Sequence, residues 1–210
     1  MSRPEMPSRP RKYHHGDLRN ALIQAGLALL NESGSHTLDL RAVARRAGVS
    51  HVASYRHFAD KNALLAAIAQ EGFVQLAEWL QTAINQADVD IEAQLIAAAR
   101  AYVDFALAQP SLMREMFSGL APRRDDYPSL HDAAKRCATL ITAIFERAQS
   151  SGLLPDGDAW VYGRQGWSTI HGLAMLLLEG QLHHILDQPN GAEQEVTMLI
   201  RTLWRGMRNR

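Results

Sequence analysis

The chain has 210 residues, of which 47% are hydrophobic and 21% charged, so it can bury a substantial core and hold a small head beside a larger body. Its single cysteine, Cys137, excludes an intramolecular disulfide framework. The Arg- and Pro-rich start lacks a signal-peptide pattern, and no uncharged apolar run reaches transmembrane length. We therefore expect a cytoplasmic protein without membrane contacts.

Charge is divided unevenly along the chain, although the 22 basic and 22 acidic residues cancel. Residues 1–70 hold 10 Lys or Arg and 5 Asp or Glu, whereas residues 71–210 hold 12 and 17. The first part carries the charge expected of a nucleic-acid surface, and the second would be repelled by phosphates. Two functions are thus separated along the sequence.

Residues 1–14 are rich in Pro, Ser and Arg and show no apolar periodicity, which predicts a disordered basic arm. Arg11 and Lys12 could enter a minor groove or contact phosphates, as short basic arms do elsewhere. The alternative is a solvated tail, and it weighs more for Arg3 and Arg9.

The next informative segment, residues 38–61, has the pattern of two short helices joined by a tight turn. Asp39 is a predicted N-cap, flanked by the apolar pair of a hydrophobic staple. Gly48 can take positive φ at little cost, so it should end the first helix, and Ser50 is placed to cap the second. This is the pattern of a helix-turn-helix, with an ordinary helical hairpin as the alternative.

The second of these helices is too polar to exist for packing alone, because it leaves little beyond Phe58, and less clearly Ser54 and Val52, for the core. Its other side chains suit a major groove: His and Ser can bond to base edges, small apolar groups can approach thymine methyls, and Arg can reach guanine or phosphate. Asp60 should cap a third helix whose first residue could meet a phosphate. The expected DNA-binding residues are Lys12, Ser50, His51, Val52, Ala53, Tyr55, Arg56, His57 and Lys61.

From Tyr13 to about Gly72 the sequence resembles the TetR family of transcriptional regulators. The resemblance lies in AGVS at 47–50, YRHF at 55–58 and the Asp60-Lys61 pair that follows. Ser54 departs from it, since the family usually has a larger apolar residue there. The resemblance implies base-reading roles for His51, Val52 and Ala53, and phosphate or backbone contacts for Tyr55, His57 and Lys61.

Beyond residue 61 the pattern is helical, with breaks at Gly and Pro clusters and no strand alternation. The expected fold is all-α, with a helix-turn-helix head at 15–60 joined to a helical-bundle body at 61–210 for effector binding and dimerisation. The first body helix should run from Lys61 to about Asn85 and link the two parts mechanically. The further helices are expected near 90–109, 111–118, 128–150, 157–186 and 192–208.

The body shows no nucleophile elbow, phosphate-binding glycine loop, zinc-binding spacing or Cys pair, so we expect no catalytic site, metal or cofactor. It does hold large, soft apolar residues that could line a ligand cavity, although for any single one of them a place in the core is the favoured alternative. The candidate effector-binding residues are Trp79, Tyr102, Phe105, Met113, Met116, Phe117, Trp167, His171 and Met175.

Trp167 and His171 are four residues apart and so share one helix face. The run from Trp167 to Gly172 is similar to the WHG motif that names one group of TetR-family C-terminal domains. Two roles stay open for His171: a hydrogen bond to an effector, or one to protein or water.

The last two long helices carry a further apolar surface that could pair with its copy across a twofold axis. Helix-turn-helix proteins usually read palindromes as dimers, and the resemblance implies dimerisation through these helices as a four-helix bundle. A homodimer is therefore expected, with packing inside the monomer as the alternative. The expected interface residues are Leu173, Leu177, Leu199 and Leu203.

These observations favour a DNA-binding transcriptional regulator, most simply a repressor released from a palindromic operator on double-stranded DNA by a small, largely apolar effector. One alternative is a constitutive activator or architectural protein without an effector. An enzyme using His171 is a weaker alternative, because the sequence offers no second catalytic group with suitable local spacing.

Overall fold

The computed structural model describes residues 15–33, 38–118 and 126–208. These residues are helical with connecting turns and contain no strand, which confirms the predicted all-α fold. The chain divides into two compact units, Met1–Leu64 and Leu65–Arg210, called here the head and the body. The predicted basic arm at 1–14, including Lys12, lies outside the described residues.

The head contains the helices α1 (His15–Ser33), α2 (Leu40–Arg46) and α3 (His51–Tyr55), and α2 packs against the other two. Asp39 caps α2 as predicted, because its Oδ1 accepts a hydrogen bond from the backbone N–H of Ala42 at 2.6 Å. Leu22, Val43 and Phe58 are among the buried residues that form its core.

The turn between α2 and α3 sets where the first helix ends and the second begins. Gly48 has a φ of 70°, and the N–H groups of Gly48 and Val49 donate to the carbonyls of Arg45 at 3.2 Å and Ala44 at 3.0 Å. This pair of bonds is a Schellman motif, which ends a helix at a residue with positive φ. The Oγ of Ser50 then accepts from the N–H of Ala53 at 3.3 Å and starts α3.

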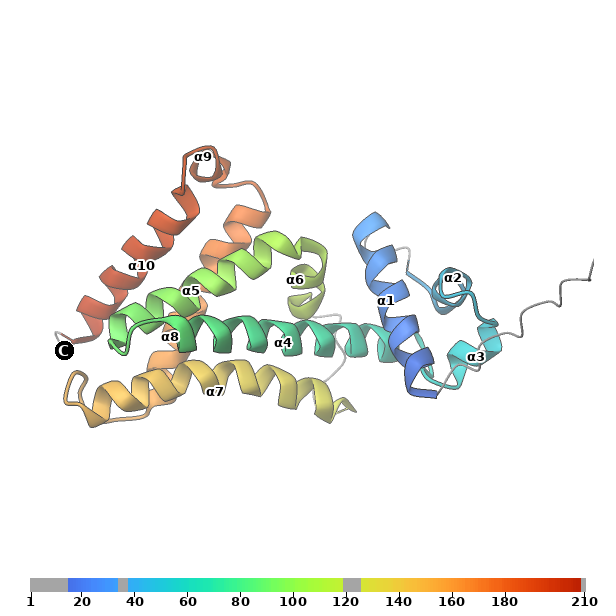
Figure 1. Ribbon diagram of the computed structural model, residues 1–210, viewed down its shortest axis with the longest axis horizontal. Helices are drawn as coiled ribbons and strands as arrows, with labels where there is room; N and C mark the ends of the chain where they lie inside the picture. Colours follow the sequence, from blue (N-terminus) through green and yellow to red (C-terminus); the bar gives the residue numbers. More distant parts are fainter. Residues whose placement is uncertain (1–14, 34–37, 119–125, 209–210) are drawn as a thin grey trace, which may run out of the picture. The chain divides into compact units, whose positions relative to one another are not determined.

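The helix α4 (Lys61–Gln86) begins in the head, where Asp60 caps it, and continues into the body. The other body helices are α5 (Ile91–Ala108), α6 (Pro110–Phe117), α7 (Pro128–Ser150), α8 (Ala159–Leu178), α9 (His183–Leu186) and α10 (Gly191–Arg208). Within the body, α5 packs against α8 and α10, and α7 packs against α5 and α8 (Figure 1). None of the helices in the described residues is both long and apolar enough to cross a membrane.

The single helix predicted for 157–186 is wrong, because the structure divides it into α8 and α9. Gly180 has a φ of 71°, and the N–H groups of Gly180 and Gln181 donate to the carbonyls of Leu177 and Leu176. The same Schellman geometry that ends α2 therefore ends α8.

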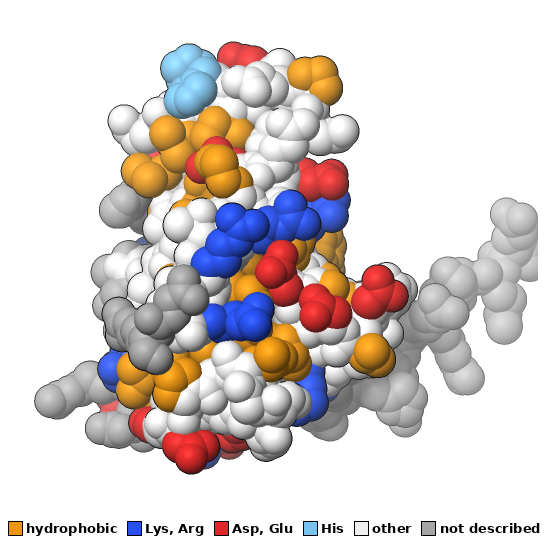
Figure 2. All heavy atoms as spheres, turned by 90° about the vertical axis from the view of Figure 1, so that its left-hand side faces the viewer, with side chains coloured by type: hydrophobic (Ala, Val, Ile, Leu, Met, Phe, Trp, Pro, Cys, Tyr) orange, Lys and Arg blue, Asp and Glu red, His pale blue; other side chains and the backbone are white. Residues whose placement is uncertain are grey.

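Charges of both signs lie close together on the body surface. The face shown in Figure 2 has Lys and Arg side chains next to Asp and Glu, with separate apolar patches between them. Two ion pairs join helices of the body: Arg100 with Glu193 at 2.5 Å, and Arg201 with Glu92 at 3.0 Å. A face of this mixed kind does not offer the continuous positive surface that DNA phosphates require.

Candidate functional site

The exposed side of α3 is the first part of the candidate site. Val52 is 58% exposed and Tyr55 48%, whereas Ser54 is the buried residue of this helix. The Ser54 hydroxyl donates to the carbonyl of His51 at 2.7 Å, so a small polar group is buried here with its hydrogen bond satisfied. Most of the short helix therefore faces outward.

The other predicted DNA-binding residues lie around this helix. Ser50, His51 and Arg56 are exposed, and Ala53, His57 and Lys61 are partly exposed. The rings of His51 and Tyr55 meet edge to face, with 5.7 Å between their centroids. This segment of the head thus exposes donors, acceptors and apolar groups.

Arginines of α2 add charge to the head. Arg46 forms a two-pronged ion pair with Glu32 of α1, and its hydrogen bonds hold the pKa of Glu32 below its usual value. Arg41 and Arg45 are exposed and form no ion pair within the described part of the chain. Their charges therefore remain available to an anionic partner, while that of Arg46 is used to hold α2 to α1.

The second part of the candidate site is a cavity of about 460 Å³ in the body, within the size range of small-molecule sites. Its walls come from α4, α5, α7, α8 and α10, together with Phe117 at the end of α6. Leu76, Phe145 and Trp204 are among its largely apolar lining. Polar groups reach it from Tyr102, Thr142 and other residues.

A small polar cluster lies at one wall of this cavity. The indole Nε1–H of Trp167 donates to the Tyr102 hydroxyl oxygen at 3.4 Å, and that oxygen lies 2.9 Å from Nδ1 of His171. The hydroxyl donates to Nδ1 or accepts from it, depending on which ring nitrogen of His171 carries the proton. Burial lowers the pKa of His171, which favours a neutral ring. The Phe117 ring packs on His171 with 4.4 Å between centroids.

The predicted effector-binding residues divide between the cavity, the core and the surface. Tyr102, Phe117 and Trp167 line the cavity, and His171 touches Tyr102 without lining the cavity itself. Phe105, Met113, Met116 and Met175 do not line the cavity. The first three of these are buried core residues.

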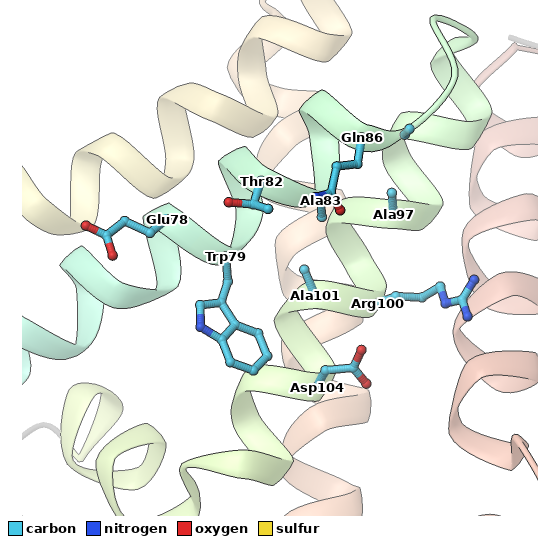
Figure 3. A pocket seen from close by; sticks show the side chains of 10 residues that line it. Glu78, Trp79, Thr82, Ala83, Gln86, Ala97, Arg100, Ala101 and Asp104 are labelled. Carbon is cyan, nitrogen blue, oxygen red and sulfur yellow. The ribbon is translucent and has the colours of Figure 1, made fainter.

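Trp79, the remaining candidate, lies at a separate hollow on the surface between α4 and α5 (Figure 3). Its ring meets that of Phe105 edge to face, with 5.7 Å between centroids. Arg100 and Asp104 extend from α5 at the same hollow, and burial raises the pKa of Asp104. Trp79 therefore belongs to this open surface and not to the body cavity.

Sequence reasoning missed the wall that α7 contributes. His131, Lys135, Ala138, Thr142 and Phe145 all line the cavity. Their spacing of four, three, four and three residues is that of one helix face, so periodicity could have found them. The wall also includes Cys137, whose thiol donates to the Phe73 carbonyl at 3.3 Å; burial raises the pKa of this thiol to about 12.

The predicted dimer-interface residues are largely occupied inside the single chain. Leu173 and Leu177 are buried, so their side chains have little surface left to bury against a second copy. Leu199 and Leu203 are partly exposed, and Leu203 lines the cavity. On the same helices, Leu176 of α8 is 46% exposed and Met198 of α10 is 58% exposed.

Comparison with known proteins places the chain in a family. Residues 22–68 match the model of bacterial regulatory proteins of the tetR family, and residues 95–204 match the model of the tetracyclin repressor-like C-terminal domain. The chain belongs to the TetR family. This confirms the resemblance seen in the sequence and the predicted class of protein, a DNA-binding transcriptional regulator.

Individual relatives and solved structures match different shares of the chain. The regulator BetI of Cronobacter sakazakii is 32% identical, over 64% of this chain and 80% of BetI. The class A tetracycline repressor of Escherichia coli is 42% identical over 89 residues, which cover 42% of this chain but only 40% of that repressor. The structure of a protein of unknown function from Rhodococcus sp. RHA1 superposes with a TM-score of 0.81 at 35% identity, covering 94% of this chain and 99% of that one.

Proposed function

We propose that this TetR-family protein is a repressor that binds a palindromic operator as a homodimer and leaves it when a small, largely apolar molecule occupies the body cavity. The observation that carries the proposal is that α4 lines the cavity through Phe73, Leu76 and Leu80 and begins at Lys61, directly after the α3 segment. One helix thus belongs to both candidate sites.

In the proposed DNA complex, α3 lies in the major groove. His51, Val52 and Ala53 meet base edges, while Ser50, Tyr55, Arg56, His57 and Lys61 meet the sugar-phosphate backbone or neighbouring bases. Lys12 of the basic arm adds a phosphate or minor-groove contact. An effector that prefers the cavity in a different α4 position would shift the equilibrium away from the DNA-binding state, in proportion to its preference.

The homodimer is proposed to use the exposed apolar residues of α8 and α10. Leu176, Met198 and the exposed part of Leu199 support this, since apolar side chains of this size gain free energy when they are removed from water. Leu173 and Leu177 would then contribute indirectly, because their buried side chains hold α8 in place within each protomer.

The alternatives are less well supported. A constitutive activator or architectural protein has no use for a cavity of this size, and the relatives are regulators and not enzymes. His171 already bonds Tyr102, which weakens its candidacy as a catalytic base.

The test begins with selection of bound genomic DNA fragments, followed by a screen for compounds that release the operator. Ala138→Trp then fills the cavity from α7, and Thr139→Trp, at the exposed neighbouring position, is the matched control. We expect the filled variant to keep operator affinity and lose release by the effector, and the control to keep both. The proposal is contradicted if the effector releases the operator equally well from the Ala138→Trp and Thr139→Trp variants.

A further inference from the structure

The permanently charged side chains at the body cavity are both basic. Lys135 of α7 and Arg164 of α8 line it, together with the imidazole of His131, and no Asp or Glu does so among the described residues. The body as a whole has the opposite balance, with 17 acidic and 12 basic residues in 71–210. The cavity is therefore a locally positive site in an acidic domain, which attracts anions and repels cations.

Lys135 and Arg164 form no ion pair among the described residues, whereas Arg100, Arg114 and Arg201 each pair with a glutamate. Arg136 is likewise without an ion pair there but does not line the cavity, so Lys135 and Arg164 are distinguished by their position in its wall. Both side chains are exposed, so their charged ends lie at the solvent edge of the cavity while they contribute to its wall. Long basic side chains commonly lie in this way along apolar surfaces.

The rest of the lining favours a hydrophobic ligand. Three of the four tryptophans in the chain, Trp160, Trp167 and Trp204, line the cavity together with Phe73 and Phe145. A fully polar anion would gain little from contact with these aromatic rings. An uncharged hydrophobic molecule would gain nothing from Lys135 and Arg164. A molecule with an apolar body and one acidic group matches both features.

We infer that the cavity selects hydrophobic monoanions, with Lys135 and Arg164 as the residues that favour the acidic group. This inference rests on the proposed function, because it names the chemical class of the proposed effector. A carboxylate on an aromatic or aliphatic body is the biological form of this chemistry, and comparison of naphthoate with decanoate distinguishes the two bodies.

The test compares two fluorescent probes with the same aromatic skeleton, the anionic anilinonaphthalene sulfonate and the uncharged N-phenylnaphthylamine, titrated into the full chain without DNA. We expect tighter binding of the sulfonate. Lys135→Met combined with Arg164→Leu should weaken sulfonate binding by on the order of tenfold, because paired charges at a partly dry site are lost, and should leave the neutral probe unchanged. Arg136→Leu, an exposed neighbour on α7 that does not line the cavity, is the control.

Ala138→Trp ties the signal to the cavity, since filling it should remove binding of both probes. The inference is overturned if the parent prefers the neutral probe, if the double variant binds the sulfonate as tightly as the parent, or if Ala138→Trp leaves sulfonate binding intact. Failure of the proposed function looks different: the charge variants weaken sulfonate binding as expected, yet no cavity ligand, naphthoate and decanoate included, changes operator affinity.

Discussion

The Tyr102 hydroxyl oxygen and Nδ1 of His171 lie 2.9 Å apart, although 69 positions separate the two residues in the sequence. The bond joins α5 to α8 beside the cavity and turns the histidine ring toward protein. His171 is therefore best understood as a positioning residue, which holds the cavity-lining hydroxyl of Tyr102 in place. A protein partner for Nδ1 is one of the two roles that the sequence left open for His171.

Tyr102→Phe is expected to destabilise the body. The substitution leaves Nδ1 of His171 and the Trp167 N–H without their shared hydrogen-bond partner, which costs about 1–2 kcal/mol in the free energy of unfolding. Urea denaturation followed by circular dichroism measures it. The control is Tyr162→Phe, because the Tyr162 ring stacks on Phe145 and its hydroxyl has no hydrogen bond in the described part of the molecule. Equal losses of unfolding free energy in the two variants would show that the hydrogen bonds of the Tyr102 hydroxyl do not stabilise the body.

Local features were predictable from the sequence, whereas the composition of the cavity was not. The Asp39 cap, the turn at Gly48 and the Ser50 cap depend on residues within a few positions of each other, so sequence patterns report them directly. Phe105 and Phe117 are of one type on neighbouring helices, yet the first is core and the second lines the cavity. That difference depends on which helix faces meet, and residues far apart in the chain decide it.

Gly72 is expected to be required for the packing of α6 on α4. A Cβ at this position would lie 2.5 Å from Sδ of Met116 and 2.9 Å from Cδ1 of Leu112, so Gly72→Ala forces these side chains to move. We expect a loss of about 1–3 kcal/mol in the free energy of unfolding. Gly172→Ala is the control, since nothing lies within 4 Å of a Cβ there, and alanine in a helix should stabilise by about 0.5–1 kcal/mol. A double variant that adds Met116→Ala should recover part of the specific loss at Gly72; strict additivity of the two effects would refute the clash.

DNA binding is expected to respond in two ways to changes at the α3 surface. Tyr55→Ala with Lys61→Ala should weaken binding to all sequences, because contacts to the DNA backbone carry no base information. His51→Ala should instead change the preference among operators, by about 1–3 kcal/mol at the affected base pair. Fluorescence anisotropy against a panel of operator variants at fixed low salt separates these effects, with Arg205→Ala on α10 as a body control. The assignment is wrong if the folded double variant keeps the affinity of the parent.

The dimer interface is expected to depend on the exposed apolar residues of α8 and α10 and not on the buried leucines of α8. Leu176→Glu with Met198→Glu should give folded monomers in sedimentation experiments, since both changes place charge on apolar surface that dimerisation would bury. Leu177→Glu should unfold the body, because that side chain is buried inside one chain. Val89→Glu, in the turn before α5, is the control and should leave the dimer intact. A parent chain that is monomeric at micromolar concentration would refute the proposed homodimer.

Cys137 is expected to report on the cavity through its slow alkylation. Burial raises the pKa of its thiol from 9.0 to about 12, and only the thiolate reacts, so near pH 8 the native chain should react with iodoacetamide roughly a thousandfold more slowly than the urea-unfolded chain. Since the native pKa is the higher one, its rate should keep rising about tenfold per pH unit where the unfolded chain levels off, above pH 9. Mass spectrometry gives both rates without ambiguity because Cys137 is the one cysteine of the sequence. A ligand bound against this wall should slow the native reaction further; native and unfolded chains that react equally fast would show that the thiol is not held against Phe73 as described.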